Sequence, residues 1–360
     1  MSSKETLDVA IVGATGAVGQ QLLELLATER LPVSSVTAVA SSRSAGRIYD
    51  FRGDTVSVVD LEHFDFAGTD LAFFSAGGDV SAAWAPRIAA SGALVIDNSN
   101  AFRMTPGVPL AVPQVNPHVL CDRPPSGVVA NPNCSTIQLV RALAPVQHAF
   151  GLERVILSSY QAASGGGLKG VDELLSASKD IVEGRPPAAP QRFPETLAFN
   201  TVPQVGDIES DGFTLEEQKL RRESQKILEL PGLRLSATCV RVPVVNGHSE
   251  AVYVECRTPV TLDQLDEVLR STSGIKLYGP EDTPSFPSPR ELGDVGMVHV
   301  GRLRVDPDSA NAFWMWVVAD NLQVGAALNA VQIAEMAVEN GILGGKRDHQ
   351  DTEIRRLNVS

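Results

Sequence analysis

The chain has 360 residues, of which 43% are apolar and 20% are charged. This length and composition are typical of a globular protein with two domains. The net charge of −13 argues against a nucleic-acid partner, although a local cationic site can still bind a small anion. The N-terminus lacks a signal-like stretch and no apolar segment is long enough to cross a bilayer, so we expect a cytoplasmic protein without a membrane partner.

The four cysteines are widely scattered and show neither Cys-x-x-Cys nor Cys/His ligand spacing. This spacing argues against structural zinc and against a disulfide framework, and it favours a reducing compartment. We therefore expect no metal site. The cysteines are Cys121, Cys134, Cys239 and Cys256.

The first third of the chain alternates between apolar strand-like runs and helical patterns. Gly13, Gly16 and Gly19 follow the first run in a Gly-x-x-Gly-x-x-Gly turn, which lets a backbone approach a pyrophosphate at a helix N-terminus. A plain tight turn is the alternative. The pattern predicts an α/β fold with a doubly wound parallel sheet. Strands are expected at 8–12, 36–40, 71–75 and 94–96, helices at 20–27 and 81–90, and cofactor contacts from Gly13, Thr15, Gly16, Ala17, Val18 and Gly19.

The segment after the second predicted strand indicates which dinucleotide binds. An NAD site usually places Asp or Glu there to hold the ribose 2′-hydroxyl. This chain instead has Ser41, Ser42 and Arg43, whose hydroxyls and guanidinium suit a 2′-phosphate. The sequence therefore favours NADP, the alternative being a polar turn with a solvated Arg43.

Cys134 follows a buried strand-like run and the turn Asn131-Pro132-Asn133, and it directly precedes a helix predicted at 135–149. The unpaired N–H groups and positive dipole at a helix N-terminus favour a thiolate at neutral pH. They can also stabilise an oxyanion formed when that thiolate attacks a carbonyl. A buried cysteine without function is the alternative. The preceding turn favours a nucleophile.

The second half of the chain changes to longer strands, some with antiparallel alternation. Two proline-rich connections, at 183–203 and 278–289, are too long for simple turns. From Asn321 a periodic apolar stretch predicts one long helix that returns to the nucleotide domain, before a polar tail after Gly344-Gly345. The strands are expected at 153–160, 233–245, 248–257, 298–305 and 313–318.

Several motifs together resemble aspartate-β-semialdehyde dehydrogenase of the bacterial type, over essentially the whole chain. The resemblance implies a Rossmann-like NADP-binding domain (1–132 and 322–360) and an inserted α+β catalytic and dimerisation domain on a mixed sheet (133–321). It also implies a homodimer that reduces L-aspartyl-4-phosphate with NADPH, on the route to lysine (diaminopimelate), methionine, threonine and isoleucine. The motifs are the glycine turn, Asp97 to Arg103, Asn131-Pro132-Asn133-Cys134, Ser159 to Gly165, Ala198-Phe199-Asn200, Glu216 to Lys219, Arg241-Val242-Pro243-Val244, Gly247-His248-Ser249-Glu250 and Asp320-Asn321-Leu322.

The resemblance assigns chemical roles to individual residues. Cys134 attacks the acyl phosphate and holds a thioester that hydride from NADPH reduces. His248 is the general acid/base, for which an imidazole that titrates near neutrality is suited. Gln161 orients the substrate through its carboxamide. Ser164, Gly165 and Asn321 lie near the cofactor, although a glycine-rich turn and a helix N-cap are the ordinary alternatives for them.

Charged residues complete the expected substrate site. Arg103 and Lys219 match the family's phosphate-binding cations, and Arg241 matches the arginine that grips the α-carboxylate by paired hydrogen bonds. Glu216, one helical turn before Lys219, is placed to meet the substrate's α-ammonium. Taken singly, each is an ordinary exposed charge.

Three alternatives remain open at this point. N-acetyl-γ-glutamyl-phosphate reductase shares the architecture, but its substrate nitrogen is uncharged, so Glu216, Lys219 and Arg241 favour a free amino acid. A cysteine acyl-hydrolase would not need the glycine turn. An inactive paralogue acting as a partner subunit would be expected to have lost Cys134 or His248. Gln218 and Gln323-Val324 depart from the family pattern in residues without a role in the chemistry, and the acidic loop 205–212 has no assigned function.

Overall fold

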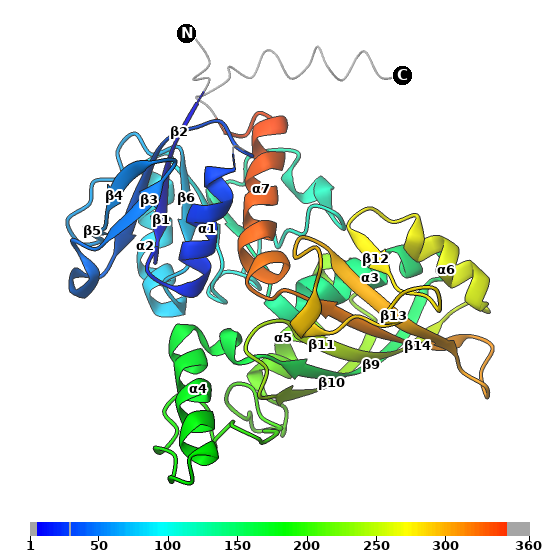
Figure 1. Cartoon of the computed structure of the whole chain (residues 1–360). Helices are drawn as coiled ribbons and strands as arrows, with labels where there is room; N and C mark the ends of the chain where they lie inside the picture. The colour runs from blue at the N-terminus through cyan, green and yellow to red at the C-terminus, as the bar shows by residue number, and fades with distance from the viewer. Residues whose placement is uncertain (1–5, 29, 344–360) are drawn as a thin grey trace, which may run out of the picture.

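The computed structural model describes residues 6–28 and 30–343. These residues form two six-stranded sheets and one small two-stranded sheet, with helices packed against them (Figure 1). The polar tail predicted after Gly344-Gly345 lies outside the described residues. Within the described ranges, no helix has both the length and the apolarity that a bilayer span requires.

The first sheet is entirely parallel, with the strand order β5-β2-β1-β6-β7-β8. The order reverses beside β1, which places a crevice at the carboxyl ends of the central strands, where dinucleotides bind in doubly wound folds. This confirms the predicted parallel sheet and its four predicted strands. The strands are β1 (Leu7–Val12), β2 (Val33–Ala40), β5 (Val59–Asp60), β6 (Leu71–Phe74), β7 (Leu94–Asp97) and β8 (Val128–Ala130).

Helices cover both faces of this sheet, which explains the continuous apolar runs in its strands. Val9 and Ile11 of β1 pack in one core with α1 (Ala17–Ala27) and α7 (Leu328–Glu339). Val12 packs in a second core with α2 (Gly78–Ala90). Figure 1 shows α7 next to α1, so the predicted return of the C-terminal helix to the nucleotide domain is confirmed.

The second sheet is mixed, with the strand order β10-β9-β11-β14-β13-β12. The β9–β10 and β12–β13 pairs are parallel and the others are antiparallel. The predicted second sheet is thereby confirmed. Its strands are β9 (Leu152–Gln161), β10 (Arg234–Arg241), β11 (His248–Cys256), β12 (Ile275–Leu277), β13 (Val298–Val305) and β14 (Ala312–Ala319).

One face of the mixed sheet is covered by α3 (Cys134–Phe150), α5 (Leu215–Ile227) and α6 (Leu262–Arg270). The other face retains partly exposed apolar side chains, among them Ile156 and Trp314. The covered face carries the catalytic candidates, because alternate residues of β11, beginning at His248, are buried against α3.

Smaller elements lie between the strands of the two large sheets. The hairpin of β3 (Ile48–Phe51) and β4 (Asp54–Ser57) forms the two-stranded sheet. Helix α4 (Leu168–Val182) projects away from the sheets, in green in Figure 1. Short 3₁₀ helices lie at Ser42–Ser44, Pro117–Leu120, Ala163–Gly166 and Pro289–Glu291.

Two predicted elements differ from the structure. The strand predicted at 233–245 ends at Arg241, because Pro243 lacks a donor for the sheet and Gly247 turns the chain with φ +90°. The helix predicted from Asn321 begins with a π-helical turn, Gln323–Ala327, before α7. A Cβ added to Gly325 in that turn would lie 2.8 Å from Cβ of Cys134, so the helix passes directly against the nucleophile. The hairpin, β12, α4 and α6 are absent from the sequence-based prediction.

Candidate active site

Cys134 is the first residue of α3, so it lies at the helix N-terminus as predicted, although the helix begins one residue earlier than expected. Asn133 caps the helix, because its Oδ1 accepts hydrogen bonds from the N–H groups of Ser135 (3.0 Å) and Thr136 (3.3 Å). Two of the N–H groups expected to face an anion are therefore occupied by the cap. The Asn133 carboxamide in turn donates to Oε1 of Glu216 at 2.9 Å, which fixes the turn against α5.

The predicted thiolate at Cys134 is wrong for the ligand-free protein. Burial, and to a lesser extent the nearby Glu216 carboxylate, raise the pKa of the thiol to about 11. The cations Arg241, Arg103 and Lys219 oppose this shift without reversing it. Loss of hydration therefore outweighs the attraction of these three cations for a thiolate. The resting nucleophile is a neutral thiol.

Three predicted site residues lie in one row across the mixed sheet. Arg241 ends β10 and pairs in register with Gln161, the last residue of β9. His248 begins β11, next to the Ser249–Tyr160 pair, and all three side chains are buried. A Cβ added to Gly165 would lie 2.6 Å from Nη1 of Arg241 and 3.3 Å from Cε1 of His248. A larger residue at this position would displace the Arg241 guanidinium.

His248 differs from its predicted protonation behaviour. Its Nδ1 accepts a hydrogen bond from the backbone N–H of Ala162 at 3.0 Å, so the proton of the neutral ring lies on Nε2. Burial, and to a lesser extent the positive charge of Arg241, lower its pKa to about 3. The prediction of titration near neutrality is therefore wrong. The buried Nε2 has no hydrogen-bond partner in the described residues, which leaves a donor available to a ligand.

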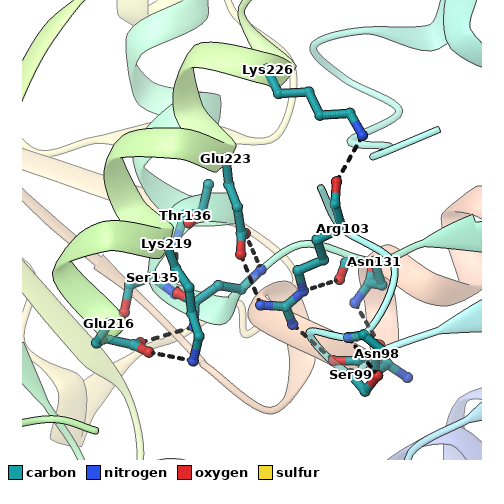
Figure 2. Close-up of polar contacts among 12 residues, drawn as sticks. Asn98, Ser99, Arg103, Asn131, Ser135, Thr136, Glu216, Lys219, Glu223 and Lys226 are labelled. Atoms are coloured by element: carbon teal, nitrogen blue, oxygen red, sulfur yellow. Dashed lines mark hydrogen bonds and ion pairs between the residues drawn. The ribbon is translucent and has the colours of Figure 1, made fainter. Parts of the chain in front are cut away.

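Arg103 is held by acceptors on three sides. Its Nε donates to the Asn131 carbonyl (3.0 Å), Nη2 to the Asn98 carbonyl (2.8 Å) and Nη1 to Oε1 of Glu223 (3.0 Å). Figure 2 shows this guanidinium between α5 and the turn that carries Asn98. Three of its five N–H groups are thus engaged, and two remain for an anion.

Lys219 and Arg241 bring two further positive charges to the site. Lys219 Nζ lies 3.1 Å from Oε2 of Glu216, one helical turn away as predicted. Arg241 Nη1 donates to the Ala162 carbonyl at 2.8 Å, and its guanidinium lies 5.6 Å from the centre of the Phe193 ring. Burial lowers the pKa of Arg241, and Glu216 partly opposes that change.

Glu216 is buried and connects most of the polar groups of the site. Its Oε1 accepts hydrogen bonds from Asn133 and from Nε2 of Gln161 (3.3 Å), while Oε2 faces Lys219. Burial raises its pKa, but Lys219 and the hydrogen bonds together hold the pKa below its usual value. The carboxylate therefore stays ionised and already orients three neighbours before any substrate ammonium arrives.

The glycine turn after β1 fits a dinucleotide pyrophosphate. Gly16 caps α1 without a side-chain hydrogen bond, and the first turn carries no acidic residue, so its N–H groups can meet phosphate oxygens. A Cβ on Gly13 would lie 2.3 Å from the Ser75 carbonyl oxygen, and one on Gly19 would lie 2.3 Å from the Gly13 oxygen. Both glycines are thus required by packing within the turn. The remaining predicted residues Thr15, Ala17 and Val18 line the same turn.

The predicted nicotinamide-side residues are also brought together. Ser164 Oγ lies 3.0 Å from Oδ1 of Asn321. This Asn321 oxygen also accepts a hydrogen bond from the Gly247 N–H at 2.9 Å. Asn321 therefore joins the Ser164-Gly165 loop to the start of the His248 strand. The N-cap alternative for Asn321 does not apply, because Oδ1 of Asp320 accepts the N–H groups that begin the following helix.

Ser41, Ser42 and Arg43 lie exposed at the carboxyl end of β2, on a short 3₁₀ helix. One carboxylate near them was not considered from the sequence. Asp60 ends the neighbouring strand β5, opposite Ala40, and accepts hydrogen bonds from its own loop, including His63 Nδ1 at 3.1 Å. Within the described residues, no group of three or more His, Cys, Asp or Glu side chains is arranged to hold a metal ion.

The structure adds site residues that sequence reasoning missed. Glu223 and Lys226 continue the polar face of α5, and Lys226 Nζ donates to the carbonyls of Arg103 (2.7 Å) and Val108 (2.9 Å). Asn98 and Asn131 are joined by a 2.6 Å hydrogen bond beside Arg103. The three- and four-residue spacing from Glu216 to Lys226 was the available signal, since it places all these charges on one helix face.

Comparisons with known proteins agree with this arrangement. Residues 8–123 match the family model described as "Semialdehyde dehydrogenase, NAD binding domain", and residues 143–324 match "Semialdehyde dehydrogenase, dimerisation domain". Aspartate-semialdehyde dehydrogenase 2 of Vibrio cholerae is 44% identical over 336 residues, which covers 93% of this chain and 99% of that protein.

Solved structures are similar over the same extent. A crystal structure of aspartate semialdehyde dehydrogenase II from Vibrio cholerae, complexed with ASA, has a TM-score of 0.90 and covers 93% of this chain and 99% of its own. A crystal structure of aspartate semialdehyde dehydrogenase with NADP from Candida albicans is 25% identical, with a TM-score of 0.74, and covers 94% of this chain and 100% of its own. On the identity and coverage of these relatives, the chain belongs to the aspartate-semialdehyde dehydrogenase family.

Proposed function

We propose that this chain catalyses the NADPH-dependent reductive dephosphorylation of L-aspartyl-4-phosphate to L-aspartate-4-semialdehyde, in the biosynthesis of lysine (diaminopimelate), methionine, threonine and isoleucine. One observation carries the proposal. A cysteine at a helix N-terminus lies in the electrostatic field of three cations, Arg103, Lys219 and Arg241, and of the carboxylate Glu216. Such a site suits a small substrate that carries two anionic ends and one ammonium group.

The substrate's charged groups are proposed to bind in separate subsites. Arg103, with two free N–H groups, and Lys219 bind the phosphate. Arg241, which pairs with Gln161 across the mixed sheet, binds the α-carboxylate. Its planar guanidinium can donate two parallel hydrogen bonds to a carboxylate. Glu216 stays ionised and holds Lys219 and Gln161 in place, so that its remaining acceptor capacity faces the α-ammonium.

In the proposed reaction the sulfur of Cys134 attacks the acyl carbon and the carbon–oxygen bond to phosphate breaks. The products of this step are a thioester on Cys134 and free phosphate, and the thiol proton leaves with the phosphate. Gln161 orients the acyl group. NADPH supplies the hydride that reduces the thioester carbon. Release of the semialdehyde then restores the thiol.

His248 is proposed to act as a hydrogen-bond donor at Nε2. The Ala162 N–H occupies Nδ1, so the neutral ring carries its proton on Nε2 and has no lone pair there to take another. That N–H can donate to the oxygen on which charge develops in the tetrahedral species. The departing sulfur takes its proton from water, because loss of the Nε2 proton would leave an imidazolate anion. The geometry therefore supports a donor role better than the acid/base role that the resemblance implies.

The cofactor is proposed to lie across the carboxyl end of the first sheet. The turn from Gly13 to Gly19 would hold the pyrophosphate, and Ser41, Ser42 and Arg43 would hold a 2′-phosphate. Ser164, Gly165 and Asn321 would contact the nicotinamide end, next to the His248 strand. We assign residues 1–132 and 322–360 to the NADP-binding domain, and residues 133–321 to the catalytic and dimerisation domain.

A homodimer is proposed from the uncovered face of the mixed sheet. Ile156 is 40% exposed and Trp314 is 36% exposed on this face, which lies inside the matched dimerisation domain. The ring of Tyr253 contacts that of Trp314, with 4.9 Å between the ring centres and a tilt of 50°. A contiguous apolar and aromatic face of this kind is typical of a subunit interface. Sedimentation equilibrium tests the proposal, and a monomer at micromolar concentration contradicts it.

The test of the function is a spectrophotometric assay. The protein is mixed with aspartate semialdehyde, phosphate and NADP, and absorbance of the reduced nicotinamide is followed. We expect reduction that depends on all three reactants. N-acetylglutamate semialdehyde is the control substrate, because its nitrogen is uncharged. Faster turnover of that control would assign the chain to the N-acetyl-γ-glutamyl-phosphate reductases, and no turnover of either would favour an inactive partner subunit.

A further inference from the structure

Glu223 on α5 lies between the expected phosphate cation and the turn that carries the nucleophile. Its side chain is 2% exposed. Oε1 accepts a hydrogen bond from Nη1 of Arg103 at 3.0 Å, and Oε2 accepts the backbone N–H of Asn133 at 2.7 Å (Figure 2). One buried carboxylate therefore joins Arg103 to the residue that directly precedes Cys134.

The two bonds use both oxygens of Glu223 and explain how a charge is tolerated at this depth. A buried carboxylate without partners would be strongly destabilising, whereas charge-assisted bonds to a guanidinium and a backbone N–H compensate its lost hydration. Because each oxygen serves a different partner, neither can move without moving the other. The carboxylate thus couples the position of Arg103 to the start of α3.

The rest of α5 supports the same two segments. Glu216 accepts a hydrogen bond from the Asn133 side chain, and Lys226 donates to the carbonyl of Arg103. Among the charged residues on this helix face, Glu223 is bonded to both the Arg103 turn and the Asn133 turn. Helix α5 therefore serves as a rigid support whose Glu223 sets the spacing between cation and nucleophile.

We infer that Glu223 is a positioning residue for the phosphate subsite. It aims the two free N–H groups of Arg103 at an anion next to the Cys134 end of α3, and it acts through Arg103 without touching the substrate. The inference rests on the proposed function, because it takes Arg103 as a phosphate ligand. A carboxylate that merely neutralised Arg103 would have the opposite effect, since its removal would strengthen phosphate binding.

The test is Glu223→Gln, measured in the direction that consumes semialdehyde, phosphate and NADP. An amide has one acceptor oxygen, so its NH₂ group must face either the Arg103 guanidinium or the Asn133 N–H, and one bond is lost at nearly constant volume. We expect the phosphate KM to rise about tenfold and the semialdehyde KM to change by less than about twofold. Glu223→Asp keeps the charge, but its shorter side chain holds the carboxylate farther from Arg103 and Asn133. We expect the same selective rise in the phosphate KM.

The matched control is Glu217→Gln on the same helix. Glu217 also accepts backbone N–H groups, from Cys239 (2.9 Å) and Thr214 (2.8 Å), but none of its contacts reaches Arg103 or Asn133. We expect it to lower the unfolding temperature without changing the ratio of the two KM values. In a double-mutant cycle, Arg103→Lys and Glu223→Gln should be non-additive for the phosphate KM.

Three results would overturn the inference. They are a phosphate KM that falls in Glu223→Gln, an unchanged phosphate KM in both Glu223 variants, and a parallel rise of both KM values that Glu217→Gln reproduces. Failure of the proposed function gives a different signature, because the unsubstituted protein would then show no semialdehyde- and phosphate-dependent reduction of NADP.

Discussion

At the scale of single residues, burial decides the chemistry of the nucleophile and the imidazole. Sequence alone predicted that Cys134 would lie at the N-terminus of a helix and that His248 would begin a strand. It could not predict their protonation states, because these depend on desolvation by segments far apart in the chain. The thiol pKa of about 11 and the imidazole pKa of about 3 describe a neutral pair at rest.

The pH dependence of Cys134 alkylation should show that its thiol is neutral at rest. With the thiol pKa near 11, we expect the rate with iodoacetamide to rise about tenfold per pH unit from pH 7 to 10, because only the thiolate reacts. The rate is followed by mass spectrometry of the peptide that contains Cys134. The exposed Cys121 serves as an internal reference. A plateau in the Cys134 rate below pH 8 would show a thiolate at rest and contradict the assignment.

The two arginines of the site should separate the two anions of the substrate. Arg103→Ala removes a cation proposed to meet the phosphate, so the phosphate KM should rise more than the semialdehyde KM. Arg241→Lys keeps the charge but loses the planar fork, so the reverse is expected, with a loss of about ten- to a hundredfold in kcat/KM. Parallel shifts of both constants in both variants would exclude separate subsites.

At the scale of elements, local pattern predicted most of the framework of the site. Local patterns of fewer than about twenty residues predict the glycine turn, the strand that ends at Gln161 and the helix after Cys134. The register that places Arg241, Gln161 and His248 in one row was not accessible, because it joins β9 to two strands that follow only after α4, α5 and their connections. Glu216 and Lys219 on the polar face of α5 were predicted from the sequence, but Glu223 was not. The role of Glu223 depends on its bond to Arg103, which lies 120 residues earlier in the sequence.

The loop after β2 should determine cofactor preference. Ser41, Ser42 and Arg43 are exposed there and offer hydroxyls and a guanidinium to a 2′-phosphate, while Asp60 on the neighbouring strand is engaged within its own loop. We expect kcat/KM to be higher with NADP than with NAD. Arg43→Ala should reduce this difference, mainly by weakening the binding of NADP. Values of kcat/KM for both cofactors measure it. Equal or better use of NAD by the unsubstituted protein would show that the loop has been misread.

At the scale of the whole molecule, alternation of strands and helices predicted the parallel sheet, the resemblance implied the mixed sheet, and apolar periodicity predicted the return of the last helix. What it could not predict is which sheet face stays uncovered, because Ile156 and Trp314 are as apolar as many core residues. The long strand predicted at 233–245 failed at Pro243 for a local reason that the sequence did contain. The π-helical turn that passes Cys134 depends on contact with α3 and had no local signal.

Global stability should depend on Glu250, which is fully buried on β11. Burial raises its pKa well above the ordinary 4.5, and Gln138 only partly offsets the shift. The folded protein therefore binds this proton more tightly than the unfolded chain. The contribution of this proton to the free energy of unfolding is fully present below pH 4.5. It is lost as pH rises toward the pKa that Glu250 has in the folded protein, by up to about 1.4 kcal/mol per pH unit.

Glu250→Gln removes this titration at nearly constant shape. We expect the variant to gain stability relative to the unsubstituted protein steadily as pH rises from 5 to 8, since the amide has no proton to lose. Urea unfolding at a series of pH values measures the difference, in which the contributions of other groups cancel. A difference that stays constant over this range would mean that Glu250 is ionised in the folded protein.

The central claim, acyl transfer to Cys134 from an aspartate-derived substrate, is tested most directly by isolating the acyl-enzyme. The protein is incubated with aspartate semialdehyde and NADP in the absence of phosphate, and its peptides are analysed by mass spectrometry. We predict one equivalent of reduced cofactor and an aspartyl group on the peptide that contains Cys134, released when phosphate is added. Cys134→Ser should give neither. Reduction of NADP without an adduct on that peptide, or equal turnover by Cys134→Ser, would contradict the account.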